Sequence, residues 1–287
     1  MDMERSILKN CIISGFADEI DSDVDKQIAL LKDLGISWLE FRSGYGINVA
    51  DHSIEQALKL QEKFKNSGIG VSAIGSPIGK IGINDDMDAC LKRLERVAEL
   101  ADIFETKYIR MFSFYMPDEK NHGLYRDEVL RRTEQMVKLA ASKNLVLLHE
   151  NEKGIYGDMA DRCLDLMQNF YGENYKCTFD FANFVQCGQD TLEAYEMLSP
   201  YIEYIHVKDA LLATGEVVPG GMGDGHLREI FEKLDSKGFE GYLSLEPHLA
   251  DFAGFKDLEP DAKERGRSDG EVAFTQAYRA LMSILNS

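Results

Sequence analysis

The chain has 287 residues, of which 44% are hydrophobic and 29% are charged, a composition that is ordinary for a soluble globular protein. Its 32 Lys and Arg residues stand against 50 Asp and Glu residues, which gives a formal net charge of −18. Such a surface repels phosphate backbones and anionic lipids, so we expect neither nucleic acid nor a membrane to be a principal partner. A local cluster of cations could still bind an anionic substrate.

The cysteines and the apolar runs bear on the cellular compartment. Five cysteines are scattered without a CxxC pair, and an odd number cannot pair completely within one chain. No run of about 18 apolar residues is present, and residues 1–10 lack the apolar centre of a secretion signal. We therefore expect reduced thiols in a cytoplasmic protein.

Short apolar runs alternate with amphipathic segments along the whole chain. The apolar runs, which we interpret as strands, lie at residues 11–16, 37–42, 69–74, 107–112, 145–150, 176–180, 202–207 and 242–245. The amphipathic segments, which we interpret as helices, lie near residues 23–34, 53–66, 86–104, 125–142, 158–171, 191–198, 225–236 and 270–285. This alternation predicts an α/β fold, a single (β/α)8 TIM-barrel domain of residues 1–287. The irregular residues 250–267 are predicted to be a surface insertion before the last helix.

The last four predicted strands each end in a residue that could bind a metal ion: Glu150, Asp180, His206 and Glu246. Because the C-terminal ends of barrel strands converge on one mouth, we expect these four side chains to meet. Taken singly, an acid after a strand is often a helix cap, and a histidine in a strand is often structural. Three carboxylates at one point repel each other unless a cation neutralises them. The set favours one divalent ion, Mn²⁺ or Mg²⁺ first, with Co²⁺, Fe²⁺ or Zn²⁺ as alternatives.

Further polar residues near these strand ends are candidates for substrate contacts. Lys208 and His248 each lie two residues after a proposed ligand, so we expect them to point the same way as that ligand. Asn151 and Asn183 could bind sugar hydroxyls, or they could cap loops. His149 directly precedes a proposed ligand, so strand alternation turns it away from the metal and favours a supporting or packing role.

Arg110 lies within an apolar strand and needs a buried partner, for which Glu40 is our prediction, although either residue could also face the substrate. Residues 219–226 are rich in glycine but lack the GxxxxGK[ST] spacing of a phosphate-binding loop, so we interpret them as a substrate-side loop or a packing turn. Four aromatic residues could form an apolar wall over the ligand or simply pack the barrel top: Phe112, Phe114, Tyr115 and Tyr156.

Four short motifs resemble those of the sugar phosphate isomerase/epimerase superfamily, whose members have a xylose-isomerase-like barrel: LHEN at 148–151, FDFAN at 179–183, YIHVKD at 204–209 and LEP at 245–247. The superfamily includes ketose 3-epimerases, hydroxypyruvate isomerases and inosose dehydratases. The resemblance extends over nearly the whole chain. It implies that Glu150, Asp180, His206 and Glu246 hold the metal, and that Glu150 and Glu246 also act as acid and base on the two faces of the substrate.

Three positions depart from the ketose 3-epimerase pattern. Asn183 stands where those enzymes carry a substrate-binding histidine, Tyr156 where they carry a second acid, and Leu212 where they carry an arginine. These departures argue against epimerisation of a free ketose, although the metal ligands and the glutamate pair are retained.

The resulting functional hypothesis is a metal-dependent isomerase or epimerase of a small sugar, sugar phosphate or related polyhydroxy carbonyl compound, acting through an enediolate. A lyase of the inosose dehydratase type begins with the same proton abstraction and is the main alternative. A non-catalytic sugar-binding barrel is less favoured. A DNA-repair endonuclease with this barrel would need more histidines than the six present, and a less acidic chain. The sequence does not decide between a monomer and a homo-oligomer.

Overall fold

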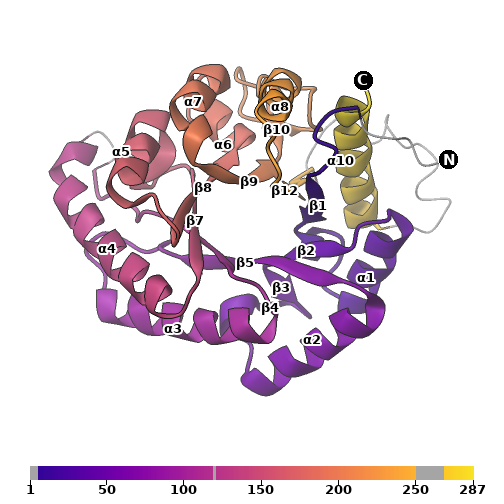
Figure 1. The fold of residues 1–287 in the computed structure, drawn as a ribbon, viewed down its shortest axis with the longest axis horizontal. Coiled ribbons are helices and arrows are strands. Elements are labelled where there is room, and N and C mark those ends of the chain that lie inside the picture. The colour runs from indigo at the N-terminus through magenta and orange to yellow at the C-terminus, as the bar shows by residue number, and fades with distance from the viewer. Residues whose placement is uncertain (1–5, 119–120, 250–267) are drawn as a thin grey trace.

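Eight parallel strands form the centre of the computed structural model, which describes residues 6–118, 121–249 and 268–287. They are β1 (Ile12–Gly15), β2 (Trp38–Phe41), β5 (Gly70–Ile78), β6 (Tyr108–Met111), β7 (Val146–Glu150), β8 (Tyr175–Asp180), β9 (Ile202–Val207) and β12 (Tyr242–Leu245). Their hydrogen-bonded order is β1-β12-β9-β8-β7-β6-β5-β2. Strands β1 and β2, at the two ends of this order, contact each other, so the barrel is nearly closed (Figure 1). The predicted α/β barrel is therefore confirmed.

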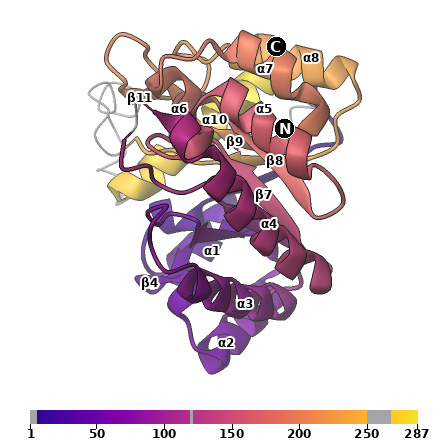
Figure 2. The same ribbon diagram turned by 90° about the vertical axis from the view of Figure 1, so that its left-hand side faces the viewer.

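Helices surround the strands as an outer ring (Figure 1). They are α1 (Val24–Asp33), α2 (Ile54–Ser67), α3 (Met87–Ile103), α4 (Arg126–Ser142), α5 (Ala160–Phe170), α6 (Phe181–Gln186), α7 (Thr191–Leu198), α8 (Leu227–Ser236) and α10 (Asp269–Leu285). Local signals set several ends: Ser53 and Ser268 form capping boxes, and Gly68 ends α2 in the left-handed conformation. In the side view of Figure 2, α3, α4 and α5 follow one another around the barrel, and α4 packs on β7.

Besides short 3-10 turns, two hairpins and one α-helix of the described residues were not predicted from the sequence. The hairpins are β3 (Ser43–Gly44) with β4 (Ile47–Asn48), and β10 (Asp209–Ala210) with β11 (Val217–Val218). The helix is α6, which begins directly after β8. All three follow strands of the barrel and so lie at its C-terminal end. Strands of two residues and a helix of six are too short to show a hydrophobic period. The predicted insertion at 250–267 lies outside the described residues.

The barrel interior below the C-terminal mouth is partly polar and completely buried. Tyr204 points inward from β9, and its hydroxyl lies 2.8 Å from Ser72 Oγ, which in turn lies 2.6 Å from Ser14 Oγ. The ring of Tyr204 also meets the ring of His206 edge to face, with centroids 5.8 Å apart. Because residues two apart on a strand share a face, this packing supports His206 from beneath.

The glycine-rich residues 219–226 wrap around a carboxylate of the chain itself. Gly221 and Gly223 donate backbone N–H groups to Asp209 Oδ2 at 2.9 and 3.0 Å, and Gly225 donates to Oδ1 at 2.9 Å. A Cβ on Gly223 would overlap the backbone of Ala210, which explains why glycine is needed there. The donors that could have held a phosphate are occupied by Asp209, so the packing-turn interpretation fits the structure.

None of the five cysteines, all of which lie in the described ranges, forms a disulfide. The described helices include none that is both long enough and apolar enough to span a lipid bilayer.

Candidate metal centre and substrate cavity

The four predicted ligands meet at the C-terminal mouth of the barrel. Glu150 and Asp180 end β7 and β8, His206 lies near the end of β9, and Glu246 directly follows β12. Each offers one ligand atom, and these atoms all lie within 4.8 Å of one another. His206 Nδ1 is 3.0 Å from Glu150 Oε1, 3.8 Å from Asp180 Oδ2 and 3.7 Å from Glu246 Oε2. Parallel pairing brings them together, since Asp180 and His206 are direct partners in the sheet.

The donor set and its unsatisfied atoms fit a divalent cation. His206 Nδ1 and Asp180 Oδ2 are buried and make no well-directed hydrogen bond among the described residues, although they lie 3.0 Å from Glu150 Oε1 and 3.1 Å from Lys208 Nζ respectively. Three carboxylates and one imidazole nitrogen are a common donor set for Mn²⁺, Mg²⁺ and related ions. Burial, together with the carboxylates of Glu246 and Glu150, raises the pKa of Asp180 to about 7, although Lys208 acts in the opposite direction. A bound cation would relieve this repulsion and leave Asp180 ionised.

Cationic side chains pair with the carboxylates of the acidic cluster. Arg110 Nη1 donates to Glu150 Oε2 at 3.1 Å, and Lys208 Nζ donates to Glu246 Oε2 at 2.9 Å and lies 3.1 Å from Asp180 Oδ2. Arg42 Nη1 also lies 3.2 Å from Glu246 Oε1, so each of the three carboxylates has a cationic partner.

Glu40 contacts His206, the proposed histidine ligand, from outside the cluster. It is buried, and its Oε2 lies 3.1 Å from His206 Nε2 and accepts a hydrogen bond from Ser244 Oγ at 2.8 Å. This contact favours a proton on Nε2, which would leave Nδ1 free to bind a cation between the carboxylates. Burial opposes the charged form of His206, but Glu150 and Glu40 outweigh it and raise the pKa of His206 well above its ordinary value. The predicted pair of Glu40 with Arg110 is replaced by Glu40 with His206.

The two predicted asparagines have different positions. Asn151 exchanges hydrogen bonds with the backbone of Asp180, its Nδ2 donating to the carbonyl and its Oδ1 accepting from the N–H, both at 2.9 Å. Asn183 sits in the first turn of α6, where its N–H donates to Asp180 Oδ1 at 2.7 Å, and its Nδ2 lies 3.3 Å from Glu150 Oε1. Asn151 thus holds the backbone of Asp180, whereas the side chain of Asn183 reaches the candidate metal cluster.

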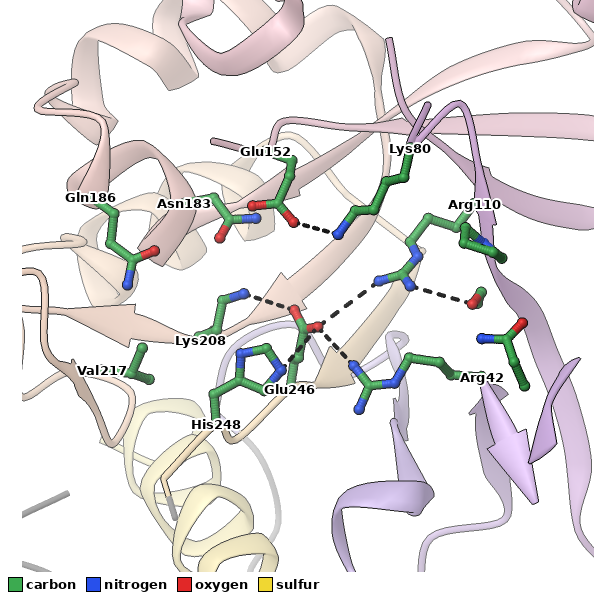
Figure 3. Close-up of a pocket in the computed structure, with 13 residues that line it drawn as sticks. Arg42, Lys80, Arg110, Glu152, Asn183, Gln186, Lys208, Val217, Glu246 and His248 are labelled. Atoms are coloured by element: carbon green, nitrogen blue, oxygen red, sulfur yellow. Dashed lines mark hydrogen bonds and ion pairs between the residues drawn. The ribbon is translucent and has the colours of Figure 1, made fainter. Parts of the chain in front are cut away.

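A cavity of about 310 Å³ adjoins this cluster through Glu246, which lies in its lining (Figure 3). It is lined by Arg42, Asn48, Gly75, Pro77, Lys80, Arg110, Glu152, Asn183, Gln186, Lys208, Val217, Glu246 and His248. Of the predicted substrate contacts, Lys208, Asn183, His248 and Arg110 therefore face the cavity. Among the residues that the structure describes, Glu40, Asn151 and the ligand Glu150 are not part of the lining.

His248 is the most open of the predicted contacts, with 45% of its side chain exposed. Its Nε2 lies 3.2 Å from Glu19 Oε1 and 3.6 Å from Glu246 Oε1. Burial works against the charged form, but the hydrogen bond to Glu19 and the charge of Glu246 raise the pKa of His248. It can therefore act as a donor at the rim of the cavity.

Several cavity residues had no assigned role in the sequence analysis. Arg42 contacts Asp18 Oδ2 at 2.8 Å and Glu246 Oε1 at 3.2 Å, and Lys80 Nζ pairs with Glu152 Oε2 at 2.7 Å. Arg42 and Lys80 both stand just beyond apolar strands, and Glu152 lies two residues after a predicted ligand. The same rule that selected Lys208 and His248 would have selected Glu152.

Two other predictions concern residues around the mouth. His149 is buried on the outer side of β7, where its Nε2 lies 2.9 Å from Ser113 Oγ, as expected from strand alternation. Tyr156 donates its hydroxyl to Asp165 Oδ2 at 2.7 Å. None of Phe112, Phe114, Tyr115 and Tyr156 is in the described lining of the cavity; Phe112, Phe114 and Tyr156 are buried, and Tyr115 is exposed.

Comparison with known proteins agrees with the fold. A segment of 129 residues is 26% identical to the 3-dehydroshikimate dehydratase of Bacillus anthracis and covers 45% of this chain and 46% of that protein, so the match spans about half the length of each. The crystal structure of the probable 3-DHS dehydratase AsbF from Bacillus anthracis superposes with a TM-score of 0.71 at 18% identity, over 96% of this chain and 99% of that chain.

The structure of the IOLI protein with a bound zinc atom superposes with a TM-score of 0.72 at 14% identity, over 96% of this chain and 98% of that chain. At such identities the superpositions establish the fold alone. The family model described as xylose isomerase-like TIM barrel matches residues 28–267. Since this match includes most of the sequence, the chain belongs to the family of xylose isomerase-like TIM barrels.

Proposed function

We propose that the chain is a divalent-metal-dependent enzyme that isomerises or epimerises a small polyhydroxy carbonyl compound, such as a sugar or sugar phosphate, through an enediolate. The observation that carries this proposal is the convergence of Glu150, Asp180, His206 and Glu246 within 4.8 Å at the mouth of the barrel. These residues would hold the ion, with Mn²⁺ or Mg²⁺ first among the candidates. Bound there, the ion would supply a Lewis acid that polarises a carbonyl oxygen and stabilises negative charge on it.

The side chains have separable tasks in this proposal. Glu246 lines the cavity and is the proposed base that removes a proton from the carbon beside the carbonyl. Lys208 and Arg110 also line the cavity and can donate hydrogen bonds to substrate oxygens. Asn183 and His248 offer further hydrogen-bonding groups at its wall and rim. Glu40 and Asn151 contact protein groups behind the cluster, so we assign them the support of His206 and Asp180 in place of substrate contact.

Dehydration is the second candidate. Four cationic side chains, Arg42, Lys80, Arg110 and Lys208, line the cavity of a chain whose net charge is −18, which favours an anionic substrate. The partial match to a 3-dehydroshikimate dehydratase points the same way. Both reactions begin with the same proton abstraction. They differ in whether a hydroxyl group leaves afterwards.

The test uses the purified chain loaded with Mn²⁺ and five compounds: 3-dehydroshikimate, D-tagatose, L-ribulose, inosose and hydroxypyruvate. Exchange of substrate protons with deuterated solvent reports the first step, and product mass separates isomerisation from loss of one water. Glu246→Gln should reduce exchange by roughly 100-fold or more, since a positioned acid or base contributes at least that much. Glu173→Gln, at an exposed site, is the control.

Full exchange by Glu246→Gln would contradict the proposal. A wild-type protein that binds no divalent metal in titrations would favour a non-catalytic sugar-binding barrel instead.

A further inference from the structure

We infer that Glu152, positioned by Lys80, is the group that exchanges a proton with the substrate on the wall of the cavity opposite Glu246. The inference rests on the proposed function and revises the role that the family resemblance gives to Glu150. It follows from the environments of these three glutamates.

Glu150 is enclosed by protein groups. Its side chain is 1% exposed, and its Oε2 accepts a hydrogen bond from Arg110. Its Oε1 lies 3.0 Å from His206 Nδ1 and 3.3 Å from Asn183 Nδ2. In the described residues it is absent from the cavity lining. Both of its oxygens are therefore engaged in the metal cluster, and neither faces the space that a substrate would fill.

Glu152 faces that space directly. It lies two residues beyond the end of β7, lines the cavity, and has 23% of its side chain exposed. Figure 3 shows Glu152 and Lys80 on one side of the cavity, with Glu246, Lys208 and Arg42 on the other. Glu152 and Glu246 are the two carboxylates of the described lining. A substrate between them would have one carboxylate on each face.

Lys80 holds Glu152 in place from a fixed loop. Its Nζ is 2.7 Å from Glu152 Oε2 and 4.3 Å from the centre of the Phe112 ring, so the ammonium group is anchored on two sides. The preceding Gly79 has a φ of +86°, and a Cβ there would overlap the carbonyl of Phe112. The close approach of the Gly79 and Phe112 backbones therefore fixes the backbone position of Lys80. Lys80 is thus a positioning residue for Glu152.

Glu152 and Glu246 together can supply both proton transfers that the reaction requires. One carboxylate removes the proton from the carbon beside the carbonyl, the C–H electron pair becomes the second bond of the enediolate, and the carbonyl π electrons move to oxygen. In epimerisation the other glutamate, in its acid form, protonates the same carbon from the opposite face. In dehydration the enediolate re-forms the carbonyl as the C–O bond breaks, and the acid gives its proton to the departing hydroxyl, which leaves as water. Neither reaction needs a further reactant.

The experiment compares Glu152→Gln with wild type on whichever of the five compounds reacts. We expect kcat to fall by roughly 100-fold or more, with KM changed by less than about threefold. Mn²⁺ content and thermal stability should stay at the wild-type level, whereas Glu150→Gln should lose Mn²⁺. Glu152→Ala should regain part of its activity when formate is added, because the small acid can occupy the vacated position.

Two further comparisons isolate the role of Lys80. Lys80→Arg should keep most of the activity and Lys80→Met should lose it in kcat, since only the first retains a cation beside Glu152. The matched control is Glu55→Gln on α2, which breaks an ion pair with Lys59 that is also 2.7 Å long but lies on the exposed surface away from the cavity. It should behave as wild type.

Three results of these measurements would overturn the inference about Glu152. An active wild type with Glu152→Gln within about threefold of its kcat would overturn the inference and leave the proposed function standing. A loss confined to KM would also overturn it, because Glu152 would then only bind substrate. A wild type that exchanges protons with none of the five compounds would overturn the proposed function and the inference together.

Discussion

Replacing Glu40 with Gln should weaken metal binding without unfolding the barrel. The carboxylate Oε2 lies 3.1 Å from His206 Nε2 and 2.8 Å from Ser244 Oγ, and the pair with His206 is fully buried. Gln can keep an oxygen in the same place but removes the negative charge, so both hydrogen bonds lose their charge-assisted part. Losing an outer carboxylate of this kind typically costs roughly 10- to 100-fold in metal affinity, or about 1.4 to 2.7 kcal/mol.

The assay is a calorimetric titration with Mn²⁺ at constant pH for wild type and Glu40→Gln, with thermal melting as the test of folding. Ser244→Ala is the matched control, because it removes one donor to Glu40 and keeps the carboxylate beside His206. Its effect should be the smaller of the two. If Glu40→Gln melts as wild type does and its affinity stays within about twofold, Glu40 does not prepare His206 for a metal, and the reasoning fails.

Two further predictions concern stability. Burial lowers the pKa of His149 from 6.5 to about 4. The unfolded chain therefore protonates His149 below about pH 6.5, whereas the folded chain does so only near pH 4. The contribution of this neutral histidine to the free energy of unfolding is fully present above about pH 6.5, and it falls by about 3 kcal/mol as the pH drops to about 4. His149→Gln can still form a hydrogen bond with Ser113 but cannot take up this proton. Urea unfolding at the two pH values should therefore show a smaller loss of unfolding free energy in the variant, and an equal loss in both proteins would refute the prediction. Asp209→Ala leaves the N–H groups of Gly221, Gly223 and Gly225 without their acceptor and should cost about 3 kcal/mol or more in the same assay, with Asp209→Asn milder. A change below about 0.5 kcal/mol would show that water replaces the carboxylate.

The barrel could be predicted because its signals are local. Each strand is a short apolar run, and each helix carries its own period and often its own cap, as with Ser53 and Gly68 on α2. The four groups that meet at the mouth could be predicted for a related reason. A parallel sheet brings the C-terminal ends of all its strands to one face, so a residue type repeated at four successive ends must converge. Glu150, Asp180, His206 and Glu246 needed no further information.

Contacts across the barrel could not be predicted in the same way. Glu40 lies on β2 and His206 on β9, and they meet only because the sheet closes on itself. Sequence alone predicts a pair of Glu40 with Arg110 because both are charged groups within strands, but a sequence does not show which of several partners lies nearer. Arg110 instead donates to Glu150, across the neighbouring pair β6 and β7.

The sequence by itself determined the order of strands and helices and the four groups that meet at the mouth, because both follow from periodicity and from the geometry of parallel strands. Only the tertiary structure decided which side chains face the cavity. Lys80 and Glu152 come from loops whose paths depend on packing, and Glu150 is enclosed by neighbours from other strands. Tertiary packing therefore decides whether a carboxylate is enclosed in the cluster, as Glu150 is, or lines the cavity, as Glu152 does.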